Sequence, residues 1–417
     1  MPNDNRLAPA DRAFHDWYRF VLAYPPHFVR EYLGRLSNSE AATVLDPFCG
    51  TGTTLVEAKK LGVAAYGVDA NSVAAFASRV KTDWRPGAAA VRERAAEVLS
   101  KAAATLSDSN GAHGRADFLT RALGARTSLI PAGFISEAPL GKVLALKGAI
   151  DDTSDRRVRE LLTLALADVI VNGAGNVGFG PEVYRTKAKK DAPVLELFQK
   201  KTMLIATDLE GLNGHRYPAT TVREGDARTL DGIPDSSIDI VLTSPPYPNE
   251  KDYTRTTRLE SVLLGFIADK HGLRVMKEHL LRSNTRNVFK SDNDGDAISG
   301  FKSITALADT IEQRRRELGK TSGFERQYAK VTRHYFGGMY RHLEALWPKL
   351  RPGARCAYVV GDQMSYFQVP IRTGALLAEL AQDLGYAVEG IDLWRYRRAT
   401  ATGIDLREEV VMLQRPA

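Results

Sequence analysis

The sequence predicts an open α/β sheet, with strands that alternate with helices along the chain. Residues 43–46 have the pattern of an apolar strand, which a glycine-containing turn joins to a helical pattern at 55–61 and a second strand at 64–68. A further apolar alternation, at 238–242, runs directly into Thr243-Ser-Pro-Pro-Tyr247. Open sheets bind ligands at the carboxyl ends of their strands, where both the glycine turn and the two prolines fall. We therefore expect one ligand site built from two distant segments.

The carboxyl-terminal part of the chain is expected to complete this sheet, with an antiparallel hairpin at one edge. The predicted elements are a helix at 340–350, a turn at Arg351-Pro-Gly353, a strand at 357–361, a helix at 373–384 and strands at 387–393 and 408–413.

Two long stretches interrupt the sheet pattern. The first, residues 86–215, falls between the second and third strands and is mostly helical. One of its helices is expected to start behind a Ser154/Asp155 cap. Within this stretch, Gly173–Gly180 breaks the helical pattern and predicts a mobile loop. The second interruption, residues 254–335, follows the two prolines.

Length and composition limit the class of protein. With 417 residues, 44% hydrophobic and 26% charged, the chain is expected to form two or three globular domains. Two cysteines, Cys49 and Cys356, exclude a disulfide framework and favour a reducing compartment. The first residues lack a basic-then-apolar leader, and no apolar run approaches the roughly 20 residues that span a bilayer. The expectation is a cytoplasmic protein with no membrane partner.

The glycine turn predicts a nucleotide-like ligand. Gly50 and Gly52 allow close approach of the backbone, and the free N–H groups of the following helix attract a carboxylate. Asp69 lies about 20 positions on, where the acid that accepts ribose hydroxyls stands in nucleotide-binding units. Asp46 adds a carboxylate suited to an ammonium group, and the third glycine of a dinucleotide fingerprint is absent. A ligand with adenosine, a carboxylate and an ammonium is S-adenosylmethionine.

The second segment suits a planar amine. Pro245 and Pro246 lack an N–H, so the carbonyls of Ser244 and Pro245 can accept hydrogen bonds without a competing local donor. Tyr247 offers a flat ring for stacking. The structural alternative is a Pro-Pro turn that only closes a buried strand.

Together, Asp46-Pro-Phe-Cys-Gly-Thr-Gly-Thr53 and Ser244-Pro-Pro-Tyr247 resemble the amino-methyltransferases of DNA, above all the N4-cytosine type. The resemblance implies a Rossmann-like, seven-stranded class I methyltransferase sheet with a largely helical insertion domain. The implied organisation is a catalytic domain in three parts, 1–85, 216–253 and 336–417. Residues 86–215 would be a helical insertion for target recognition, and 254–335 a basic insertion for DNA contact.

The same resemblance assigns roles to residues. Tyr24-Pro-Pro-His-Phe28 resembles the segment that closes over the methionine end of the cofactor. Glu224-Gly-Asp-Ala227 resembles the motif whose acid meets the adenine amino group. The implied catalytic, base-binding residues are Ser244, Pro245, Pro246 and Tyr247. The implied cofactor-binding residues are Tyr24, Pro25, Asp46, Pro47, Phe48, Cys49, Gly50, Thr51, Gly52, Thr53, Asp69, Ala70, Asp226 and Ala227.

The implied reaction is methyl transfer from S-adenosylmethionine to the exocyclic amine of a base flipped out of double-stranded DNA, with cytosine N4 favoured. Adenine N6 stays open because some adenine enzymes tolerate serine at this place. RNA amino-methylation stays open because the first motif also resembles tRNA guanine-N2 enzymes, and so does a non-catalytic nucleic-acid-binding protein that keeps the fold. Carbon-5 chemistry on cytosine is excluded, because neither Cys49 nor Cys356 follows a proline.

Charge indicates where a polyanion would lie. Lys+Arg outnumber Asp+Glu by 17 to 11 in 251–335 and by 18 to 15 in 85–215, in a chain of net charge +7. The candidate DNA contacts are Arg255, Arg258, Arg185 and Lys187. The eight histidines show no metal-ligand spacing, so we expect no metal. The expected partners are double-stranded DNA and a cognate restriction endonuclease or defence-system proteins.

Overall fold

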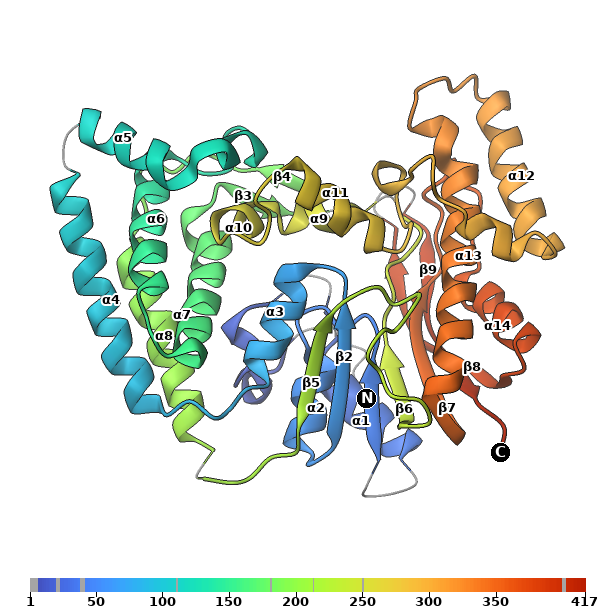
Figure 1. Cartoon of the computed structure of the whole chain (residues 1–417). Helices are drawn as coiled ribbons and strands as arrows, with labels where there is room; N and C mark the ends of the chain where they lie inside the picture. Colours follow the sequence, from blue (N-terminus) through green and yellow to red (C-terminus); the bar gives the residue numbers. More distant parts are fainter. Residues whose placement is uncertain are drawn as a thin grey trace.

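The computed structural model describes residues 7–19, 23–37, 42–109, 112–180, 182–212, 214–249, 251–399 and 403–417. Seven strands form one mostly parallel sheet in the order β5-β2-β1-β6-β7-β9-β8 (Figure 1). Only β9 runs antiparallel to its neighbours, β7 and β8. The predicted fold class is confirmed, including the antiparallel hairpin at one edge. The strands are β1 (Thr43–Asp46), β2 (Ala64–Asp69), β5 (Thr220–Glu224), β6 (Ile238–Thr243), β7 (Leu350–Gly361), β8 (Ala387–Arg398) and β9 (Asp405–Gln414).

Helices cover both faces of the sheet, which explains why its strands read as nearly continuous apolar runs. Val44 of β1 packs with residues of α1 (Pro26–Leu36) and α2 (Thr53–Lys60). Its neighbour Leu45 points to the other face and packs with α13 (Tyr328–Leu346) and α14 (Thr373–Asp383). From β1 the order extends in one direction through β2, and from β6 in the other. The reversal between β1 and β6 is where such sheets bind ligands.

The first insertion is a helical domain beside the β5 edge of the sheet (Figure 1). Its helices share a hydrophobic core with α3 (Ser72–Lys81), and Asp155 caps α7 as predicted, accepting hydrogen bonds from the N–H groups of Arg157 and Val158. Its helices are α4 (Ala88–Asp108), α5 (Ala112–Leu123), α6 (Glu137–Asp151), α7 (Arg156–Val169) and α8 (Val194–Glu210).

The mobile loop predicted at Gly173–Gly180 is wrong. After a single wide turn at Ile170–Ala174, strand β3 (Val177–Phe179) pairs with β4 (Val183–Arg185) in an antiparallel ribbon. A Cβ on Gly178 would lie 2.6 Å from the Tyr184 ring, so this glycine allows a tyrosine to pack across the ribbon. Glycines that indicate flexibility in a sequence here permit close packing instead.

The second insertion crosses the carboxyl edge of the sheet and then forms a lobe at the far side, containing α12 (Figure 1). The predicted boundary at 335/336 is wrong because it falls inside α13, and the helix predicted at 340–350 begins and ends earlier than expected. The turn predicted at Arg351–Gly353 is absorbed as an irregularity within β7, where the pairing register with β6 shifts. The helices of this insertion are α9 (Tyr253–Thr256), α10 (Arg258–Leu263), α11 (Lys270–His279) and α12 (Lys302–Glu317).

In the described part of the chain, we find no helix with the length and apolar character needed to traverse a bilayer.

Candidate active site

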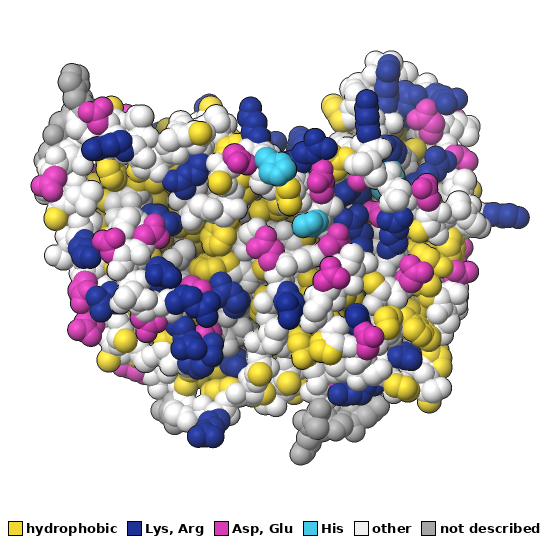
Figure 2. Space-filling view, in the orientation of Figure 1, with side chains coloured by type: hydrophobic (Ala, Val, Ile, Leu, Met, Phe, Trp, Pro, Cys, Tyr) yellow, Lys and Arg dark blue, Asp and Glu magenta, His cyan; other side chains and the backbone are white. Residues whose placement is uncertain are grey.

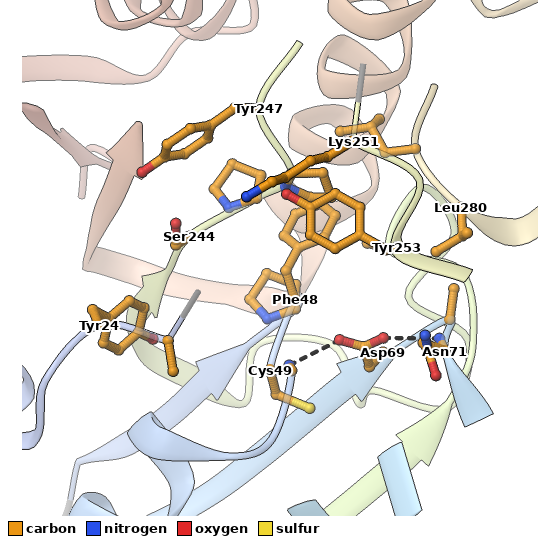
Figure 3. A pocket seen from close by; sticks show the side chains of 18 of the residues that line it. Tyr24, Phe48, Cys49, Asp69, Asn71, Ser244, Tyr247, Lys251, Tyr253 and Leu280 are labelled. Carbon is orange, nitrogen blue, oxygen red and sulfur yellow. Dashed lines mark hydrogen bonds between the residues drawn. The ribbon is translucent and has the colours of Figure 1, made fainter. Parts of the chain in front are cut away.

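A cavity of about 350 Å³ opens at the carboxyl edge of the sheet, beyond the ends of β1 and β6 (Figure 3). Both sequence motifs line it, although they lie almost 200 residues apart in the chain. We call its two sides the glycine-turn end and the proline end. The glycine-turn end consists of Pro47, Phe48, Cys49, Gly50, Thr51, Thr53, Asp69, Ala70 and Asn71, and the proline end of Ser244, Pro245, Pro246 and Tyr247.

Asp69 organises the glycine-turn end. Its carboxylate accepts hydrogen bonds of 2.8 Å from the N–H groups of Gly50 and Asn71, so it fixes the turn after β1 against the end of β2 (Figure 3). Gly50 adopts a positive φ of 50°, a conformation that favours glycine. Burial raises the pKa of Asp69 to about 6, against the two N–H donors that lower it. A carboxylate has about four acceptor positions, so two remain for a ligand in the cavity.

Three of the predicted cofactor residues, Pro25, Asp46 and Gly52, do not line the cavity. Asp46 is 1% exposed, and its carboxylate accepts hydrogen bonds from Thr243 Oγ1 (2.6 Å), Phe48 N (3.2 Å) and the Tyr24 hydroxyl (3.1 Å). Burial raises its pKa. The expected contact between Asp46 and an ammonium group is therefore not made from the cavity wall. Asp46 instead ties the end of β1 to the end of β6, and thereby joins the two motifs.

Tyr24, expected near the cofactor, does line the cavity. Its hydroxyl is hydrogen bonded to both Asp46 and Thr54, which holds the amino-terminal arm over the start of α2. Pro25 stands outside the cavity, at the residue before α1. Gly52 precedes α2 with φ of 84° and packs closely on Ser78.

The proline end is held by the strands on the other side of β6. The Ser244 hydroxyl donates a hydrogen bond of 3.1 Å to the Val359 carbonyl of β7. The Tyr247 hydroxyl donates one of 2.9 Å to Glu408 of β9, and the pKa of Tyr247 is raised by burial and by this carboxylate. Because the Ser244 proton is directed at Val359, the lone pairs of its oxygen are left to accept from a ligand.

Asp226 and Ala227 follow β5 and line the cavity. The Asp226 carboxylate forms an ion pair of 2.6 Å with Arg228, which also contacts Asp294 of the second insertion at 2.6 Å. The Ala227 carbonyl lies 2.7 Å from His342 Nδ1, and burial lowers the pKa of His342 to about 4. Neutral His342 therefore donates to Ala227 from Nδ1. The second insertion is thus part of this wall of the cavity.

Sequence reasoning missed several lining residues. Lys251 and Tyr253 lie within six positions after the proline motif, so their closeness to it in the sequence could have indicated that they line the site. Arg395 and Arg397 alternate along β8, beyond the strand predicted at 387–393, and Arg395 pairs with Glu408. The remaining missed residues are Ala23, Asn71, Arg228, Asn249, His279, Leu280, Leu281 and Glu408.

The four predicted DNA contacts lie outside the cavity lining. Arg185 and Lys187 are exposed on and beside the β3–β4 ribbon. Arg255 faces Glu182 of that ribbon at 3.7 Å. Arg258 is largely enclosed: it donates to the Thr254 hydroxyl at 3.1 Å, and burial lowers its pKa. Arg258 is thus less available to a phosphate than expected.

Comparison with known proteins agrees with this geometry. A family model described as a DNA methylase of the N6/N4 type matches residues 15–77, the segment that carries Tyr24, the glycine turn and Asp69. A type II methyltransferase of Geobacillus stearothermophilus, M.BsoBI, is 22% identical over 98% of this chain and 87% of its own length. The chain is similar to DNA amino-methyltransferases.

Two further relatives carry the same kind of name. Type II methyltransferase M.AvaI of a Nostoc species is 27% identical over 37% of this chain and 32% of its own length. Type II methyltransferase M.MvaI of Kocuria varians is 23% identical over 66% of this chain and 67% of its own length.

Methyltransferases of this family use S-adenosylmethionine as methyl donor. The glycine-turn end fits this molecule, since Asp69 keeps free acceptor positions beside backbone that a ligand can approach closely. The cavity volume lies within the range of small-molecule sites.

Proposed function

We propose that this protein methylates the exocyclic amine of a base in double-stranded DNA, and that the base is cytosine, modified at N4. The observation that carries the proposal is that Gly50 and Ser244 line the same cavity. Asp46, the last residue of β1, accepts a hydrogen bond from Thr243, the last residue of β6, and so holds the two motifs together. For direct transfer of a methyl group between two ligands, the glycine-turn end that would hold the cofactor and the proline end that would hold the amine need to face each other.

The glycine-turn end would hold the cofactor. Asp69 would accept the ribose hydroxyls, and the backbone around Gly50 would approach the ligand closely. Asp226 is expected to meet the adenine amino group through the remaining acceptor positions of its carboxylate, because both of its oxygens already accept from Arg228. Tyr24, Pro47, Phe48, Thr51, Thr53, Ala70 and Ala227 complete the proposed contacts. When bound, S-adenosylmethionine supplies a methyl group activated on a sulfonium.

The proline end would prepare the nucleophile. An exocyclic amine is a poor nucleophile because its lone pair is delocalised into the ring. Ser244 Oγ and the Pro245 carbonyl would accept its two N–H groups and favour a pyramidal nitrogen. Tyr247 would stack on the base and hold its plane. Catalysis would then rest on positioning and oriented dipoles, without a covalent enzyme intermediate.

Serine at 244 supports cytosine over adenine within the proposal, because aspartate or asparagine is commoner at this place in adenine enzymes. The base must leave the duplex to reach the proline end of the cavity, and this flipping costs a few kcal/mol.

The DNA would lie over the carboxyl edge of the sheet. Figure 2 shows that the surface dips between the α5 end and the α12 lobe, with Lys and Arg side chains along this upper edge. Arg255, Arg274 and Arg286, all more than a third exposed, belong to the segment that crosses it. Phosphate contacts from this segment and from Arg185 and Lys187 would offset the cost of base flipping. The names of the relatives support a place in a restriction–modification system, with a cognate endonuclease as partner.

The proposal is tested by methyl transfer onto unmethylated genomic DNA and, in parallel, onto total RNA, with mass spectrometry of the nucleosides. We expect N4-methylcytosine in DNA and no product in RNA. N6-methyladenine would overturn the choice of base, and product only in RNA would overturn the choice of polymer. The Ser244→Ala variant serves as the matched control for contaminating activity.

A further inference from the structure

A lysine that the proposed mechanism does not use points into the cavity. Lys251 lies seven positions after Ser244, and its side chain extends over the cavity toward the proline end (Figure 3). It is half-buried among the lining residues. Its ammonium has no hydrogen-bond or ion-pair partner among the residues that the structure describes. An ammonium that has lost part of its hydration without gaining an acceptor is costly, so a ligand atom is the natural partner.

The backbone of Lys251 is fixed on both sides, so the direction of the side chain is built into the fold. Its N–H donates to Asn249 Oδ1 at 3.3 Å, and its carbonyl accepts from the amide of Asn284, a fully buried residue of the second insertion, at 2.9 Å. The next residue, Asp252, is anchored by Lys277 at 3.2 Å.

The charges around Lys251 leave the ammonium uncompensated. Arg397 acts as a like charge and Glu182 as an opposite one, and burial together with Arg397 lowers the pKa of Lys251. Glu182 is shared with Arg255 and Arg286, at 3.7 and 3.6 Å. Within the described part of the chain, Lys251 is therefore a cavity cation whose ammonium keeps free donors, whereas Arg397 donates from one terminal nitrogen to the Asp362 carbonyl at 3.2 Å and keeps its buried Nε without a partner. Arg228 and Arg395, by contrast, are paired with carboxylates.

We infer that Lys251 is a specificity-determining residue that donates a hydrogen bond to a ring-edge acceptor of the flipped base, the O2/N3 edge of cytosine. This inference rests on the proposed function. With the amine held at Ser244 and Pro245 and the ring against Tyr247, the edge beside the amine faces the interior of the cavity, where Lys251 points. Cytosine presents a carbonyl oxygen and a ring nitrogen next to its amine, both acceptors, and an ammonium carries only donors. A backbone phosphate would instead stay at the mouth, outside the aromatic walls of Tyr247 and Tyr253.

The test compares Lys251→Met, Lys251→Arg and the control Lys101→Met, which removes one exposed charge on α4, far from the cavity in the helical insertion. Each variant is assayed on short duplexes that carry the target mapped by the transfer assay, with either cytosine or an abasic site at the methylated position. For Lys251→Met we expect kcat/KM on cytosine to fall roughly ten- to hundredfold, the effect of one charge-assisted hydrogen bond. Affinity for the abasic duplex and for S-adenosylmethionine should stay within about twofold of wild type, because neither involves the base.

Lys251→Arg should retain part of the activity, and Lys101→Met all of it. Equal loss of affinity for cytosine and abasic duplexes, with a salt slope reduced by about one, would show a phosphate contact and overturn the inference. Unchanged transfer by Lys251→Met would overturn it as well. A wild-type protein with no transfer to DNA would instead refute the proposed function, so the two failures are distinguishable.

Discussion

The Tyr247 hydroxyl donates a hydrogen bond of 2.9 Å to Glu408, a residue 161 positions later in the chain. The second oxygen of Glu408 is bound by Arg395 of the neighbouring strand. Behind the ring, a Cβ on Gly361 would lie 3.0 Å from Tyr247 Cε2, so the space there is occupied. The ring proposed to stack on the base is thus locked by the final hairpin of the sheet rather than by its own motif.

Two variants of Tyr247 distinguish the contribution of the aromatic ring from that of the hydroxyl. We expect Tyr247→Ala to lower kcat/KM by roughly 10²-fold, because a misplaced base loses the near-attack geometry. Tyr247→Phe should lose only a few-fold, since it keeps the aromatic face. Affinity for S-adenosylmethionine, measured by calorimetry, should be unchanged in both variants. Full activity of Tyr247→Ala would contradict the stacking role.

Removal of the Ser244 hydroxyl tests the acceptor role. We expect Ser244→Ala to lower kcat roughly 10²- to 10³-fold, the loss typical of one preorganised polar contact in a reaction site. Ser237→Ala, at the opposite end of the same segment, is the matched control and should leave kcat unchanged. Single-turnover methyl transfer measures both, and equal rates in the two variants would refute the assignment.

Alanine substitutions at two glycines distinguish an effect of backbone strain on stability from an effect of the shape of the cofactor turn on binding. Gly52 and Gly62 have similar φ values of 84° and 77°, but a Cβ on Gly52 would lie 2.8 Å from Ser78 Oγ, whereas Gly62 faces open space. Alanine at either position should lower the free energy of unfolding by about 1–2 kcal/mol through left-handed strain. Only Gly52→Ala should also weaken cofactor binding, because Ser78 holds the Gly50 carbonyl at 2.7 Å. Thermal unfolding and calorimetry measure the two effects. Equal cofactor affinities would contradict the expectation.

The buried Asp69 predicts opposite pH trends for binding and stability. Its folded pKa of about 6 lies above the unfolded value, so its contribution to stability is fully present below about pH 4 and is lost as pH rises through 6. Ribose hydroxyls need the ionised carboxylate, so affinity for S-adenosylmethionine should fall about tenfold per pH unit below 6. Calorimetric titration with S-adenosylmethionine between pH 5 and pH 8 measures this change in affinity, because that range includes the pKa of about 6. Asp69→Asn should bind more weakly and without this pH dependence; a flat wild-type profile would exclude Asp69 from the contact.

Local patterns in the sequence were sufficient for the sheet and for both ligand motifs. The alternation at 238–242 and the Asp155 cap depend on neighbours a few residues away, and the Gly50 turn meets Asp69 19 positions later, within one strand–helix–strand unit. Periodicity and capping chemistry act over that range, so a sequence expresses them directly.

The tertiary structure decided which of these groups face the ligand. Asp46 turns inward because Thr243, almost 200 residues later, completes its hydrogen bonds, and Tyr247 depends on Glu408 in the same way. Lys251 points into the cavity because Asn284 of the second insertion holds its carbonyl. Such contacts follow from the pairing of distant strands and the packing of insertions. The periodicity of the sequence does not encode these contacts, because the two residues of each pair come together only after the chain has folded.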